Sequence, residues 1–288
     1  MRRGVARSLG IVPEPVPSEP KLSVRGVRKS FPTQRGGRVE ALEDITFDVA
    51  PGEFVCLLGP SGSGKSTVLN VLAGLDVPDA GSITMNGRPI TGPGPDRAVL
   101  FQEPALFPWM TVLGNVEFAL RMVDVAEEER RAKAMQWLSK VHLARFTDAH
   151  PHELSGGMRQ RAALARALAC SPEVLLADEP FGSLDAQARE SLQQEVQRVW
   201  AETGTTFVFV THNVREAALL ADRVLLMSAA PGVLLEEYRI RAPRPRHLED
   251  ALLSRVVVDI HDRLAEGVSK VAARETGEPG GTVESVER

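Results

Sequence analysis

A nine-residue stretch, GPSGSGKST, combines the residue types that bind phosphate groups. Its spacing matches the pattern G-x-x-x-x-G-K-[ST], in which glycines let consecutive backbone N–H groups curl around phosphate oxygens at the start of a helix. Lys65 would contact the β- and γ-phosphates, and Ser66 would ligate Mg²⁺. We predict that this phosphate loop binds a nucleoside triphosphate through all of its residues: Gly59, Pro60, Ser61, Gly62, Ser63, Gly64, Lys65, Ser66 and Thr67.

Two adjacent carboxylates, Asp178 and Glu179, follow the apolar run VLLA. Burying these charges without partners would cost on the order of several kcal/mol. A metal ion and a water molecule would offset that cost. Alone, such a pair could also be a helix cap. Together with the phosphate loop, it predicts that Asp178 ligates Mg²⁺ and that Glu179 polarises the attacking water.

Two further polar residues, Gln102 and His212, stand where short apolar runs end. Either could be an ordinary loop residue. However, the carboxyl ends of parallel strands meet at one edge of a sheet, where ligands bind. We therefore predict that both residues take part in catalysis by sensing the γ-phosphate, and that Gln102 also reaches the metal ion.

The elements that must position these residues follow from the hydropathy pattern. The phosphate loop lies between the apolar run EFVCLLG and the stretch STVLNVLAGL, which has helical spacing. The runs EVLLAD and TTFVFVTH predict buried strands separated by the helical AQARESLQQEVQRVWAETG. This alternation predicts an α/β fold with a mainly parallel sheet. Further strands are expected at 22–31, 39–49 and 98–102, a hairpin at Asn86-Gly87, and helices within 111–143.

The two ends of the chain differ in composition from its middle. Residues 1–20 contain four prolines and no periodic apolar pattern, which predicts a disordered arm. An amphipathic helix is expected at 247–268, followed by a Gly-rich, acidic and disordered tail at 269–288. A net charge of −4 gives no basic field, so no nucleic-acid partner is expected. No apolar run reaches the roughly 18 residues that a membrane span needs.

The stretch LSGGM, at residues 154–158, completes a set of motifs that resembles the nucleotide-binding subunits of ABC transporters. The resemblance covers residues 21–246 and implies a P-loop NTPase core with an antiparallel β part and a helical insert at about 103–165. It implies that Phe31 stacks on the adenine of ATP and that Asp185 belongs to the D-loop. It also implies a head-to-tail dimer, in which Ser155, Gly156 and Gly157 of one chain contact ATP held by the other. Met158 departs from the glutamine common at its position.

Two local stretches resemble the ATP-binding subunits of importers of nitrate, sulfonate, taurine and related anions. They are QEPALFPWMTVLGNV and VLLMSAAPGVLLEEYRIRAPRPR. The resemblance implies an ATPase on the cytoplasmic face of the membrane, with ATP and Mg²⁺ as cofactors. Its partners would be integral permease subunits and, indirectly, a substrate-binding protein. A rival class, ABC ATPases that act on nucleic acid or ribosomes, usually has two cassettes or a long coiled-coil insert. A regulator without turnover is disfavoured by Glu179.

Overall fold

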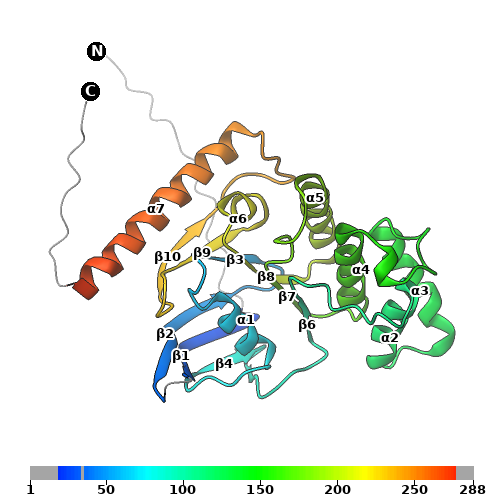
Figure 1. Cartoon of the computed structure of the whole chain (residues 1–288), viewed down its shortest axis with the longest axis horizontal. Helices are drawn as coiled ribbons and strands as arrows, with labels where there is room; N and C mark the ends of the chain where they lie inside the picture. The colour runs from blue at the N-terminus through cyan, green and yellow to red at the C-terminus, as the bar shows by residue number, and fades with distance from the viewer. Residues whose placement is uncertain (1–18, 34–35, 277–288) are drawn as a thin grey trace, which may run out of the picture.

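The computed structural model describes residues 19–33 and 36–276, which form two β-sheets and flanking helices (Figure 1). Residues 1–18 of the predicted arm and 277–288 of the predicted tail lie outside the described residues. The larger sheet has the order β10-β9-β3-β8-β7-β6, and only its edge pair β10–β9 is antiparallel. Its strands are β3 (Phe54–Leu58), β6 (Arg97–Leu100), β7 (Val174–Asp178), β8 (Thr206–Thr211), β9 (Arg223–Met227) and β10 (Leu234–Arg239).

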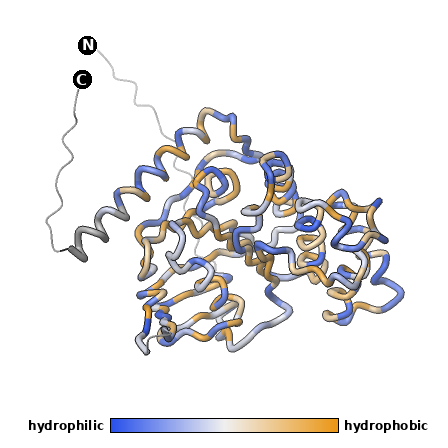
Figure 2. Tube along the Cα trace, viewed as in Figure 1, coloured by the Kyte–Doolittle hydropathy of each residue, from blue (hydrophilic) through white to orange (hydrophobic). Residues whose placement is uncertain are grey.

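The central strands are buried on both faces, which explains their continuous apolar runs. In β3, Phe54, Cys56 and Leu58 point into a core shared with helices α2 to α7. Val55 and Leu57 point into a second core on the opposite face. Figure 2 shows the hydrophobic residues gathered along these central strands.

An antiparallel sheet and helix α1 (Lys65–Ala73) cover that opposite face. The sheet has the order β2-β1-β4-β5. Its strands are β1 (Leu22–Pro32), β2 (Arg38–Val49), β4 (Ala80–Met85) and β5 (Arg88–Pro89). The predicted hairpin joins β4 to β5, and both turn residues, Asn86 and Gly87, have positive φ angles of 49° and 74°. Asn-Gly favours this type of turn because both residues tolerate the left-handed region.

A helical subdomain lies at one end of the molecule (Figure 1). It contains α2 (Val112–Met122), α3 (Glu127–Lys140), a short 3₁₀ turn η1 (Pro151–Glu153) and α4 (Gly156–Ala169). The predicted end of the insert, at about 165, falls inside α4. This helix continues because Leu164, Ala165 and Leu168 remain in the same core.

The remaining helices are α5 (Ala186–Thr203), α6 (Val214–Leu220) and α7 (Ala251–Thr276). The predicted bounds of the last helix were wrong at both ends. It starts after Asp250, whose side chain accepts from the backbone N–H of His247 in a preceding turn at 3.1 Å. It extends past 268 because the stretch KVAARE consists mostly of good helix formers. Leu253 and Ile260 anchor α7 in the core, beside α6 and β10.

Candidate active site

Loops that follow adjacent strands meet at the carboxyl edge of the larger sheet. The phosphate loop follows β3, Asp178 ends β7 and His212 follows β8. In the parallel register, Leu58 lies opposite Thr211, and Asp178 lies opposite Val210. The sheet therefore delivers the phosphate loop, the carboxylates and the histidine to its carboxyl edge, where α/β sheets bind ligands.

The phosphate loop places an open helix N-terminus beside a buried ammonium group. Gly64 is the N-cap of α1 with a φ of 80°, and no side chain of the described residues caps the helix there. A Cβ at Gly64 would lie 2.6 Å from the Ala41 oxygen, so only glycine fits. Nζ of Lys65 donates to the carbonyls of Gly59 at 2.9 Å and Pro60 at 2.8 Å. Burial lowers the pKa of Lys65. Positive charge and free backbone N–H groups together suit a polyphosphate.

Ser66 and Asp178 provide the two side-chain oxygens that would ligate a metal ion. The hydroxyl of Ser66 donates to Oδ1 of Asp178 at 2.9 Å. Burial raises the pKa of Asp178; the Ser66 hydrogen bond opposes this effect, and the neighbouring Glu179 adds to it. Mg²⁺ prefers one or two hard protein oxygens together with phosphate oxygens and waters. This donor set therefore fits magnesium bound with a nucleotide.

Glu179 and His212 are in direct contact. Nδ1 of His212 lies 2.9 Å from Oε2 of Glu179. The backbone of Glu179 has a φ of 41°, which is uncommon for a residue with a side chain, and its N–H donates to the Val210 carbonyl at 3.0 Å. Such strain persists where the surrounding structure imposes it, often at active sites. The Glu179 side chain is 22% exposed, so solvent reaches its carboxylate.

Two other predicted residues lie in loops beyond β6 and before α5. Gln102 lies beyond the end of β6, beside the loop that follows Glu179. A Cβ at Gly182 would come within 2.9 Å of the Gln102 Nε2 atom. Asp185 caps α5 and accepts from the Ala188 N–H at 2.8 Å.

Comparison with known proteins fits this geometry. The family model for ABC transporters matches residues 42–182. The nitrate import ATP-binding protein NrtD of Synechocystis sp. is 46% identical over 222 residues, which cover 77% of this chain and 83% of that protein. The chain belongs to the ABC transporter ATP-binding proteins. Another member, the bicarbonate transport ATP-binding protein CmpC of Synechococcus elongatus, is 44% identical over 80% of this chain and 35% of that protein.

The solved structures agree on the fold. The dimeric, post-hydrolysis structure of the ATP-binding cassette MJ0796 bound to ADP and Pi matches with a TM-score of 0.68 and 33% identity. The match covers 77% of this chain and all of that chain. The predicted fold class is confirmed, and the chain is an ABC ATPase that hydrolyses ATP.

The ABC signature loop, residues 154–158, lies at the N-terminus of α4. The Ser155 hydroxyl accepts from a backbone N–H of α4 at 3.3 Å. A Cβ at Gly157 would lie 3.1 Å from the Ala188 side chain, so the loop packs against α5. Within the described part of the chain, no hydrogen bond or ion pair joins it to residues 59–67. Its helix packs on the face of the larger sheet opposite to α1 (Figure 1).

Phe31, the predicted adenine contact of the ABC fold, lies at the end of β1. Its side chain is 40% exposed, and the Lys29 ammonium lies 5.2 Å from the ring centroid. Phe31 pairs with Val39 of β2, and Ala41 of the same strand adjoins the phosphate loop. Phe31 therefore lies on β1, next to β2, which is the strand that contacts the phosphate loop.

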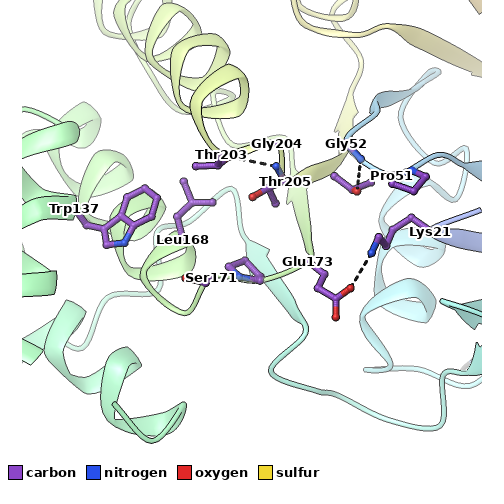
Figure 3. Close-up of a pocket in the computed structure, with 12 residues that line it drawn as sticks. Lys21, Pro51, Gly52, Trp137, Leu168, Ser171, Glu173, Thr203, Gly204 and Thr205 are labelled. Atoms are coloured by element: carbon purple, nitrogen blue, oxygen red, sulfur yellow. Dashed lines mark hydrogen bonds and ion pairs between the residues drawn. The ribbon is translucent and has the colours of Figure 1, made fainter. Parts of the chain in front are cut away.

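A pocket of about 440 Å³ lies at the other edge of the sheet (Figure 3). Its lining includes Gly52, Glu173 and Thr205, which precede β3, β7 and β8. Lys21 pairs with Glu173 there at 2.8 Å. Because the motif residues follow these strands instead, this pocket is separate from the predicted ATPase site.

Sequence reasoning missed part of the support behind the predicted ATPase site. Glu216 of α6 is buried and contacts Thr211, the last residue of β8. Arg189 approaches it from α5. A charged residue in the first turn of the otherwise apolar stretch EAALLA was the available signal, but α6 itself was not predicted.

Proposed function

We propose that the chain is the energy-coupling subunit of an importer for small anions, docked to permease subunits on the cytoplasmic face of the membrane. The supporting observation is its 46% identity with the nitrate import protein NrtD over most of both chains. Nitrate, bicarbonate, sulfonate and taurine are the anions to test. No helix within residues 19–33 and 36–276 is long and apolar enough to cross a membrane. A substrate-binding protein would act with the permease, which selects the anion.

The proposed roles follow from the placement of these residues at the carboxyl edge of the sheet. Ser66, Asp178 and Gln102 would hold Mg²⁺, which would supply charge neutralisation at the phosphates. Lys65 and the phosphate loop bind the triphosphate. Glu179 accepts the proton of the attacking water, and His212 fixes the orientation of that carboxylate and senses the γ-phosphate.

Replacing Lys65 with alanine is expected to weaken ATP binding by about 10- to 100-fold, because a charge-assisted contact to phosphate is lost. Equilibrium binding of a fluorescent ATP analogue measures the effect. Lys21→Ala, which removes a lysine at the opposite edge of the sheet, is the matched control. Equal affinities for the two variants would contradict the role of Lys65.

We further propose that two copies associate head to tail, so that the signature loop of one chain closes on ATP held by the other. The dimeric MJ0796 structures support this arrangement. The N-terminus of α4 supplies backbone N–H groups and a positive helix end for the partner's phosphates. Ser155, Gly156 and Gly157 would make that contact.

The surface around residues 102–109 is the proposed permease contact. Leu106 packs against the core, and Phe107 is half-buried with its ring 4.8 Å from that of Phe118. Trp109, in contrast, is 71% exposed. A pocket of about 480 Å³ is lined by Met110 and by residues of α2 and α3. An exposed tryptophan beside a concave surface is typical of an interface anchor.

Trp109→Glu is expected to lower both copurification with the permease and transport on the order of tenfold. Basal ATPase activity and the melting temperature should stay at parental values because the side chain is already exposed. Val77→Glu is the matched control, since Val77 is 70% exposed on a different surface. If the Trp109→Glu chain still copurified with the permease as the parent does, this docking surface would be wrong.

The function as a whole is tested by purifying the chain with its membrane partners. The complex should hydrolyse ATP faster when its binding protein carries nitrate, bicarbonate, sulfonate or taurine. Copurification with ribosomes or nucleic acid instead would favour the rival class.

A further inference from the structure

A second carboxylate, Glu216, lies behind the proposed catalytic pair. It is 6% exposed, although it belongs to the first turn of the short helix α6. The hydroxyl of Thr211 donates to its Oε2 atom at 2.7 Å, and the Gln193 amide donates to its Oε1 atom at 3.4 Å. Thr211 directly precedes His212. Glu216 therefore holds the end of the strand that carries the histidine.

Arg189 reaches the same carboxylate from α5. Its Nε atom lies 3.9 Å from Oε1 of Glu216, while its Nη2 atom donates to the Leu184 carbonyl at 3.0 Å. Among the described residues, no group accepts a hydrogen bond from this buried Nε atom. Arg189 thus links Glu216 to the D-loop, which includes Leu184 and Asp185.

A cavity of about 60 Å³ joins the two pairs. Its lining includes Glu179 and His212 as well as Arg189 and Glu216. It is large enough for a water molecule. The Arg189–Glu216 contact therefore borders the same cavity as the proposed catalytic pair.

We propose that Glu216 is a positioning residue that couples the D-loop, through Arg189, to the His212–Glu179 pair, through Thr211. The proposal rests on the roles of Glu179 and His212 proposed above. The D-loop lies beside the signature loop, which is the proposed contact with the partner chain. The coupling would therefore make the alignment of the catalytic pair depend on the partner chain.

A purely structural role explains the charge of Glu216 poorly. Burial raises its pKa, against the opposing effects of the Thr211 hydroxyl and Arg189, so the site disfavours the ionised form. A glutamine of the same shape would keep the hydrogen bond from Thr211 and avoid that cost. In the proposed coupling, the carboxylate differs from the amide in the charge that it presents to Arg189.

The decisive experiment compares ATP turnover in the full-length chain. Glu216→Gln is expected to lower kcat on the order of tenfold and to change the KM for ATP by less than about threefold, because alignment is lost and binding is kept. Arg189→Ala should have a similar effect, and the double variant should fall no further than either one. Glu53→Gln removes the comparable ion pair with Arg223, 2.9 Å long at the opposite edge, and should keep parental kcat.

Each contrary result has a definite meaning. Parental kcat in Glu216→Gln, or additive losses in the double variant, would overturn the coupling. If Glu216→Gln does not fold, Thr211→Val tests the same link, since it removes the hydroxyl and keeps the shape; parental kcat there would also overturn the coupling. Glu179→Gln is assayed alongside: its full activity would overturn the proposed base and this inference with it. An inactive Glu179→Gln beside a fully active Glu216→Gln would overturn the coupling alone.

Discussion

Replacing Glu179 with glutamine is expected to slow ATP hydrolysis by at least about 100-fold, because an amide is a far poorer proton acceptor than a carboxylate. Binding of Mg-ATP should stay within about threefold of the parent, since the phosphate loop and Asp178 are unchanged. Phosphate release under saturating ATP measures the first quantity, and binding of a fluorescent ATP analogue measures the second. The amide has the same shape, so the contact with His212 is kept.

The control is the glutamate at the other end of the same strand. Glu173 precedes β7, whereas Glu179 follows it, and Glu173 pairs with Lys21 at 2.8 Å. Glu173→Gln should hydrolyse ATP like the parent, because its carboxylate lies at the opposite edge of the sheet. If Glu179→Gln turned over ATP as fast as Glu173→Gln, the assignment of the base would be wrong.

The sequence predicted the parts of the fold that depend on local chemistry. β3, β7 and β8 were expected because their continuous apolar runs require burial on both faces, and the structure confirms them. The Asn86-Gly87 turn was expected because two consecutive positive φ angles favour these residues. The common edge of Lys65, Asp178 and His212 followed from parallel strand geometry.

The remaining features depend on tertiary packing and were not predictable in the same way. α6 is only seven residues long, too short for a helical period to be recognised, so Glu216 had no assigned surroundings. The direct contact between Glu179 and His212 joins residues 33 apart, and strand order alone did not fix it. The boundary near 165 fell inside α4 because composition does not change where that helix enters the common core.

The arrangement of α1 and α4 bears on how the signature loop works. The two helices pack on opposite faces of the larger sheet. Residues 154–158 contact α4, the preceding turn η1, Leu184 and α5. The exposed N-cap Ser155 is therefore available to another molecule. Two identical chains can satisfy each other's sites only in a head-to-tail arrangement, and a mixed dimer separates this from use of the loop within one chain.

In a Glu179→Gln background, a Lys65→Ala chain paired with a Ser155→Arg chain is expected to trap about one ATP per dimer. If each site joins one chain's phosphate loop to the other chain's signature loop, both defects fall in one site and the second site is intact. If each chain used its own signature loop, every site would carry one defect and none would trap ATP. The lost site reflects a missing phosphate contact and a bulky side chain at the helix N-terminus.

Two different affinity tags isolate the mixed dimers, and bound nucleotide is counted after washing. The parent Glu179→Gln dimer should trap two ATP molecules, and each variant paired with itself should trap about none. Ser155→Arg also removes a helix cap worth about 1 kcal/mol, so its melting temperature is compared with that of Ser155→Ala, which loses the cap without the bulk. One ATP in the mixed dimer, with none in either matched pair, requires phosphate loop and signature loop to come from different chains. A count near zero in mixed dimers that remain folded and associated would count against that arrangement.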